Sequence, residues 1–361
     1  MSVRRKRSLA ARLEGRPLLL SAAAAVIAIG AAAGMSWAAG PHAVHDRLRE
    51  LVPVWLAVAA GARLLAYVGY AIAHRRVTAA CGESELEAQS AARVVAFGAG
   101  ATSLKGGFSI DLRALRGAGA SRGEARAHVA ALALLEYAVL ALLAWIGAVT
   151  LIGAPHAQGQ VVWPWVIGVP AGTLVALLAN RQLRGGRAGR LRARVRPLLR
   201  GADILAEFSR RPAGAAAALA GMLVYWFAEA AALWAGLRAF GAPSTPAVAM
   251  VGLATGFAFT PRGLPLAGAG IAEVLVPISL LWLGVPLPAA VLAALAAELT
   301  RLAVSIPFAV VARAEVRRLV RLGERAERSA AAARGDRRLT PADRARAALA
   351  ASLSNIRRVF T

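Results

Sequence analysis

The chain contains one cysteine, Cys81, and only two lysines, Lys6 and Lys105, among its 361 residues. A single cysteine excludes an internal disulfide and a thiolate cage for a metal ion. The five histidines lie in loops or near the ends of apolar segments, so a metal site is not predicted: His42, His45, His74, His128 and His156.

Familiar catalytic patterns are also missing. The sequence has no P-loop, HExxH, G-x-S-x-G or Rossmann glycine pattern. These absences remove support for ATP-driven transport within this chain and for common hydrolase chemistry. We therefore predict no cofactor and no enzymatic activity.

Apolar residues are abundant. They make up 58% of the chain, and runs of about 20 residues recur along it, the length that crosses a bilayer as a helix. This pattern predicts an all-α polytopic membrane protein. We expect about six full crossings plus two broken, re-entrant hairpins, giving six to eight apolar segments that are related as an inverted repeat.

The formal net charge of +24 comes from arginines that cluster in short segments beside apolar runs. Clusters at residues 4–16, 181–200 and 313–318 predict that these segments and both termini are cytoplasmic. The same clustering argues against a nucleic-acid partner. We expect a multi-pass protein of the cell (plasma) membrane, with a basic arm at residues 1–16, a transmembrane domain at 17–312 and a basic amphipathic tail at 313–361.

Two segments interrupt the apolar pattern. Residues 260–273, TPRGLPLAGAGIAE, place prolines, glycines and two charges between apolar stretches, and residues 88–118 are similarly broken around Lys105 and Asp111. Non-helical backbone at membrane depth survives only where it is packed in protein or lines a wet cavity. Broken helices of this kind form binding sites in transporters.

The two broken segments occupy matching places in the halves 17–152 and 161–312. The stretch AALALLE ends at Glu136 in the first half, and AALAAE ends at Glu298 in the second. We predict that these two glutamates lie at equivalent depths on crossings of opposite direction. The two hairpins would then meet near the membrane midplane.

Charged groups at membrane depth are costly, so those in the apolar segments are candidates for a binding site. Each carboxylate has two interpretations, a structural ion pair or a substrate contact, and Glu298 and Arg301 are spaced to pair with each other. Glu273 is expected to fix the broken helix. Arg262 and Lys105, at glycine-flanked hairpin tips, suit an anionic lipid headgroup. The predicted substrate-binding residues are Arg63, Lys105, Glu136, Glu229, Arg262, Pro265, Gly268, Gly270, Glu273, Glu298 and Arg301.

Residues 252–307 resemble the C-terminal signature of the lysylphosphatidylglycerol synthase transmembrane, or flippase-like, family. Motif positions are occupied by Pro265, Gly268, Gly270 and Glu273, and Pro307 resembles the closing proline. The segment GGFSIDLRALRGAGASRGEARAHVAALALLEYAVL is similar to the first-half segment of that family. The sequence departs from the family pattern at three places: Ala269 stands where a second glycine is common, Tyr137 follows Glu136, and Arg301 lies about one residue closer to Pro307 than expected.

The resemblance covers most of residues 17–312 and implies a lipid translocator that moves a phospholipid or a lipid-linked headgroup between leaflets. Its partners would be anionic or polyprenyl-linked membrane lipids, with homo-oligomers left open. The soluble aminoacyl-transferase domain of the best-known members is not found in this sequence, so a separate lipid-modifying enzyme is expected. Two alternatives remain: a membrane-embedded lipid or glycolipid transferase with Glu273 or Glu136 as general base, and a scaffold for a partner lipid synthase.

Overall fold

The computed structural model describes residues 17–79, 120–184, 189–210, 212–258 and 270–338, together with Val95, Leu112 and Leu115. Over these ranges the chain forms helices and no strand. The longer helices are α2 (Pro17–Ala38), α3 (Pro41–Arg49), α4 (Pro53–Ala79), α7 (Arg122–Thr150), α8 (Gly159–Arg184), α9 (Gly189–Ser209), α10 (Pro212–Ala239), α11 (Pro246–Ala258), α12 (Ile271–Trp282) and α13 (Leu287–Arg338).

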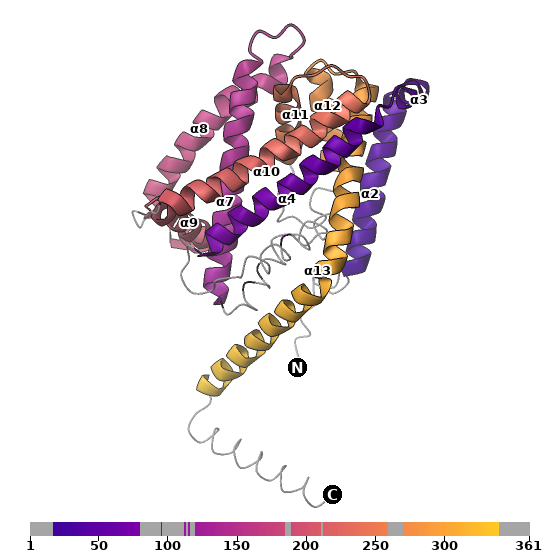
Figure 1. Cartoon of the computed structure of the whole chain (residues 1–361). Coiled ribbons are helices and arrows are strands. Elements are labelled where there is room, and N and C mark those ends of the chain that lie inside the picture. Colours follow the sequence, from indigo (N-terminus) through magenta and orange to yellow (C-terminus); the bar gives the residue numbers. More distant parts are fainter. Residues whose placement is uncertain are drawn as a thin grey trace, which may run out of the picture.

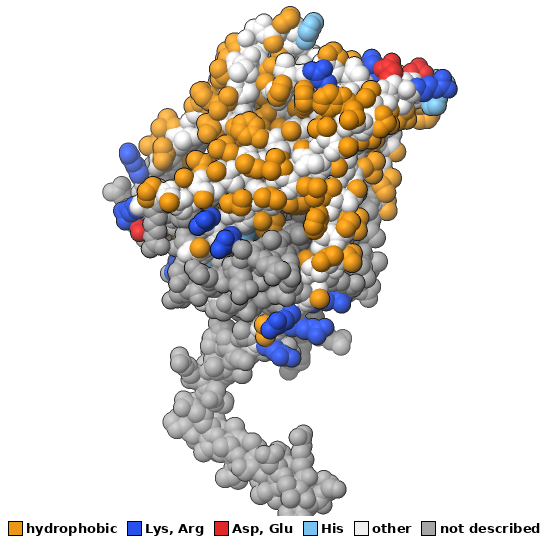
Figure 2. Space-filling view, in the orientation of Figure 1, with side chains coloured by type: hydrophobic (Ala, Val, Ile, Leu, Met, Phe, Trp, Pro, Cys, Tyr) orange, Lys and Arg blue, Asp and Glu red, His pale blue; other side chains and the backbone are white. Residues whose placement is uncertain are grey.

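Five of these helices are long and apolar enough to cross a membrane: α4, α7, α8, α10 and the first half of α13. Three shorter apolar helices accompany them, formed by residues Val26–Ala38 of α2, by α11 and by α12. Figure 2 shows apolar side chains over the sides of the bundle and basic side chains near its ends. The fold therefore confirms an all-α polytopic membrane protein.

The α4 and α10 helices run side by side and form the most extensive helix contact of the bundle (Figure 1). Their backbones touch at Gly69 and Gly221. A Cβ atom on Gly69 would lie 2.5 Å from the Gly221 carbonyl oxygen, and a Cβ atom on Gly221 would lie 2.7 Å from the Gly69 oxygen. Small residues allow this close approach, which is a common way for helices to associate in membranes.

We expect Gly69→Leu to destabilise the bundle strongly, because the new side chain would meet the backbone of α10. The matched control is Gly61→Leu on the same helix, where no atom lies within 4 Å of the added Cβ. Thermal unfolding in detergent measures both variants. Equal melting temperatures for the two would contradict the observed α4–α10 contact.

The pair α11–α12 begins and ends at one end of the bundle. The two helices are antiparallel, since Gly252 packs on Leu280, and Val276 lies beside Gly256. At the end of α12, the Gln158 amide donates to the Trp282 carbonyl oxygen at 2.8 Å. With 13 and 12 residues, the helices are about 20 and 18 Å long, short of the ~30 Å hydrocarbon core. Residues 259–269, which join them, lie outside the described residues.

Three segments differ from their sequence-based description. Residues 189–209, expected as part of a basic loop, form α9, which packs on α7 because Gly201 meets the backbone at Ala130 and Ala131. Its amphipathic pattern supplies Ile204 and Leu205 to the core. Residues 41–49, between α2 and α4, form the short helix α3, and α13 continues past Ala312 to Arg338 as one helix. The tail beyond Arg338 and almost all of the broken segment at 88–118 lie outside the described residues.

The two helices that carry Glu136 and Glu298 run in opposite directions. The loop after α7 meets the connection between α12 and α13, because a Cβ atom on Gly284 would lie 2.5 Å from the Cβ atom of His156. The C-terminal end of α7 and the N-terminal end of α13 therefore lie at the same end of the bundle. The inverted repeat itself stays a prediction, since the first hairpin is not among the described residues.

Candidate charged site at mid-membrane depth

Three helices bring charged side chains to a similar depth. Arg63 lies ten residues into α4, Glu229 lies ten residues before the end of α10, and Glu298 lies eleven residues into α13. At a rise of about 1.5 Å per residue, each is roughly 15–17 Å from the same end of the bundle. Measured along its helix, such a distance would place each charge near the middle of a hydrocarbon core of about 30 Å.

Arg63 and Glu229 form a sealed ion pair. The Arg63 Nη1 atom contacts Glu229 Oε2, and the two side chains are only 4% and 7% exposed. The other terminal nitrogen of Arg63, Nη2, donates to the Ala297 carbonyl oxygen on α13 at 3.1 Å. Arg63 thus joins α4 to both α10 and α13. This geometry favours the structural interpretation of both residues over a substrate contact.

Glu298 and Arg301 form a second ion pair, which is open. Arg301 Nε donates to Glu298 Oε2 at 2.9 Å, and Arg301 Nη2 pairs with Glu298 Oε1. The side chains are 35% and 26% exposed, several times more than those of the sealed pair. The pairing expected from their spacing of three is confirmed, and the pair retains an accessible surface at membrane depth.

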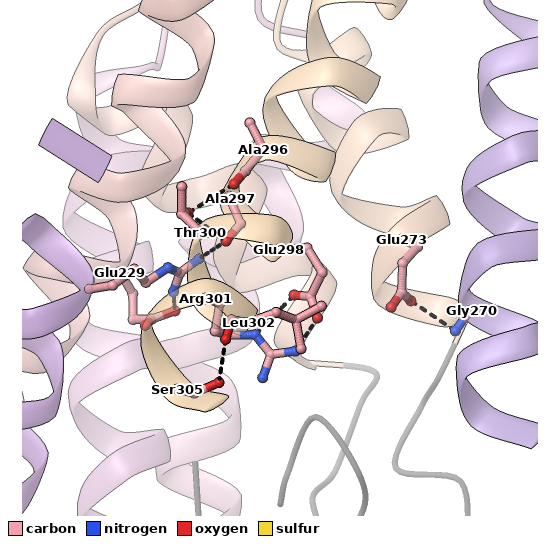
Figure 3. Close-up of polar contacts among 11 residues, drawn as sticks. Glu229, Gly270, Glu273, Ala296, Ala297, Glu298, Thr300, Arg301, Leu302 and Ser305 are labelled. Atoms are coloured by element: carbon pink, nitrogen blue, oxygen red, sulfur yellow. Dashed lines mark hydrogen bonds and ion pairs between the residues drawn. The ribbon is translucent and has the colours of Figure 1, made fainter. Parts of the chain in front are cut away.

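Glu273 lies near the open pair, at the start of α12 (Figure 3). Its Oε2 atom accepts a hydrogen bond from the Gly270 amide at 2.8 Å, which caps the helix after the break. Gly270 has a φ of 87°, a left-handed conformation that favours glycine. Glu273 also interacts electrostatically with Glu298 and Arg301. The open region therefore combines two carboxylates and one guanidinium.

Glu136 occupies a different environment. Its side chain is 1% exposed and lies 3.5 Å from the Tyr70 hydroxyl. Its carbonyl oxygen accepts a hydrogen bond from the indole Nε1 of Trp226 at 2.9 Å. The remaining predicted site residues, Lys105, Arg262, Pro265 and Gly268, lie outside the described residues.

Two residues near the charged site were not predicted from the sequence. Tyr67 interacts electrostatically with Arg63, Glu229 and Arg301, and its hydroxyl lies near the fully buried Ser305. Tyr67 follows Arg63 by four residues, and Ser305 follows Arg301 by four, so each shares a helical face with its arginine. A spacing of four from an arginine was therefore the sequence signal that could have identified Tyr67 and Ser305.

Arg63 and Glu229 thus form a buried, structural ion pair, whereas Glu298 and Arg301 form a partly exposed one. Within the described ranges, no cluster of three or more His, Cys, Asp or Glu side chains could hold a metal ion. No protein-family model matches the chain, and no curated protein is similar to it in sequence.

Proposed function

We propose that this protein is a lipid translocator, in which the Glu298–Arg301 pair receives a polar headgroup between the two leaflets. The observation that carries this proposal is the contrast in exposure between the two ion pairs at one depth. A lone charge in hydrocarbon is costly, and an accessible pair at this depth is a characteristic of substrate pathways. A headgroup phosphate suits Arg301, because a guanidinium binds phosphate oxygens through two parallel hydrogen bonds.

Two further observations support the proposal. The α11 and α12 helices are each shorter than the hydrocarbon core, and Glu273 at the start of α12 lies near the open charges, an arrangement that suits the broken helices of transporters. The residues that resemble the flippase-like family, 252–307, include most of α11, all of α12 and the span of α13 that carries both charges. An anionic phospholipid or a polyprenyl-linked headgroup is the proposed substrate, in the plasma membrane.

Leaflet exchange in reconstituted vesicles tests the proposal. Vesicles containing the purified protein and a fluorescent anionic phospholipid, or a fluorescent polyprenyl phosphate, are treated with a membrane-impermeant quencher. The expected result is loss of about all the fluorescence, against about half in protein-free vesicles. Loss of only half for both lipids, with the protein correctly inserted, would contradict translocation and favour the scaffold alternative.

Cysteine labelling tests the proposed orientation. In a Cys81→Ser background, Arg181→Cys at the end of α8 is expected to be protected from an impermeant maleimide in intact cells, whereas Gln160→Cys at its start is expected to react. Arginine clusters beside the first position favour the cytoplasmic side. The reverse labelling pattern would invert the proposed topology.

A further inference from the structure

The α2 helix is one of the two most loosely packed long helices of the bundle, together with α8. Its neighbours in the described part of the chain are α3, α12 and α13. From Val26 to Ala38 no residue is buried, and the Ser36 hydroxyl bonds to Ala32 within the same helix. A Cβ atom on Gly30 or Gly34 would have no neighbour within 4 Å. Loose packing of this kind marks an element that can move at low cost.

The α2 helix packs against the start of α12. A Cβ atom on Gly270 would lie 2.8 Å from Ile27 Cγ2 and 3.6 Å from Ala31 Cβ. Gly270 is also the residue whose amide is bound by Glu273. Because Gly270 has no side chain, α2 can pack closely against the chain there, just before the first residue of α12.

The two larger neighbours of α2 are the helices that carry the open charges. Glu273 lies in the first turn of α12, and Glu298 and Arg301 lie in the span of α13. Figure 1 shows α2 at the edge of the bundle, alongside α13. By contrast, α10 meets α13 through a close backbone approach, since a Cβ atom on Gly236 would lie 2.9 Å from the Ala293 carbonyl oxygen. The contact of α13 with α2 is therefore looser than its contact with α10.

We infer that the seam between α2 and α12 is the lateral entrance through which a lipid headgroup reaches Glu298 and Arg301. This inference rests on the proposed function. The acyl chains remain in the bilayer while α2 moves away from Gly270, and the headgroup passes between the helices. For a headgroup to enter, Ile27 must move away from Gly270.

The first test compares two isoleucines of α2. Ile27→Ala removes the side chain that meets Gly270 and is expected to raise the leaflet-exchange rate about threefold or more. The matched control is Ile29→Ala, which makes the same change on the same helix at a side chain that is 69% exposed, against 43% for Ile27. The control is expected to exchange lipid at the wild-type rate. Equal rates for the two variants would overturn the inference.

The second test locks the seam. Ala31→Cys with Gly270→Cys, in a Cys81→Ser background, places two Cβ atoms 3.6 Å apart, within the range of a disulfide. Because the Cβ atom added at Gly270 also lies 2.8 Å from Ile27 Cγ2, at a residue with positive φ, rates are compared only between the oxidised and reduced states of this double variant. Oxidation is expected to reduce exchange at least tenfold relative to the reduced sample, and a reductant should restore it. Equal rates in the oxidised and reduced states would contradict a moving α2. If the reduced double variant is itself inactive, the Ile27 and Ile29 comparison decides.

Lipid translocation and the entrance at α2 can be contradicted separately. Wild-type protein that exchanges no lipid would overturn the proposed function and the entrance together. Wild-type exchange that responds neither to Ile27→Ala nor to the disulfide would overturn the entrance alone and leave the translocator proposal standing.

Discussion

Glu298→Gln and Arg301→Gln are each expected to lower lipid exchange at least tenfold while the helices remain assembled. Each change leaves one charge of the open pair without its partner and removes a contact for the headgroup. A tenfold loss corresponds to about 1.4 kcal/mol, within the range of one charge-assisted hydrogen bond. The measurement is the leaflet-exchange rate at matched protein density.

The control for these variants lies between the two charges. Leu299→Ala changes a side chain that is 63% exposed on the same turn of α13 and is expected to leave exchange unchanged. Glutamine variants that exchange lipid at the rate of the Leu299→Ala control would remove the open pair from the pathway.

Arg63→Met is expected to produce the largest loss of stability, about 3–5 kcal/mol, because it leaves the buried Glu229 carboxylate without its partner. It also removes the hydrogen bond to the Ala297 carbonyl oxygen on α13. Unfolding of the purified protein in detergent measures the loss.

A double variant separates a structural role from a general loss of polarity. Arg63→Met combined with Glu229→Leu removes both charges and is expected to recover most of the stability, since an apolar pair can replace a buried ion pair. Arg238→Met is the surface control: Arg238 lies over the Trp234 ring at 5.2 Å, a contact worth about 0.5–1 kcal/mol. A loss of stability for Arg63→Met no larger than that of this control would contradict the sealed pair.

Local patterns in the sequence predicted the parts of the structure that depend on neighbouring residues. Apolar runs predicted the five helices that are long enough to cross a membrane, although the run at residues 17–39 is found only among the shorter apolar helices. A spacing of three predicted the Glu298–Arg301 pair, because helical geometry alone places those side chains together. Glu273 was likewise expected to fix the broken helix, and its bond to Gly270 is a contact between residues three apart. These features need no knowledge of how the helices pack.

Long-range pairing was beyond the sequence patterns. Arg63 and Glu229 belong to different helices, and which carboxylate meets which arginine depends on how alanine-rich helices pack. The difference between a sealed and an open pair also arises from packing, as does the place of α2 over Gly270. Residues 189–209 were missed as a helix because their charge density masked an amphipathic face that packs on α7.

The most direct test of the central claim is to locate the headgroup of a bound lipid. A phospholipid with a photoactivatable group on its headgroup can be cross-linked to the reconstituted protein, and the modified residues can be mapped by mass spectrometry. The account predicts modification of α13 between residues 296 and 305 and of the first turn of α12. Modification confined to the ends of the helices, with none at this depth, would contradict a headgroup site at Glu298 and Arg301.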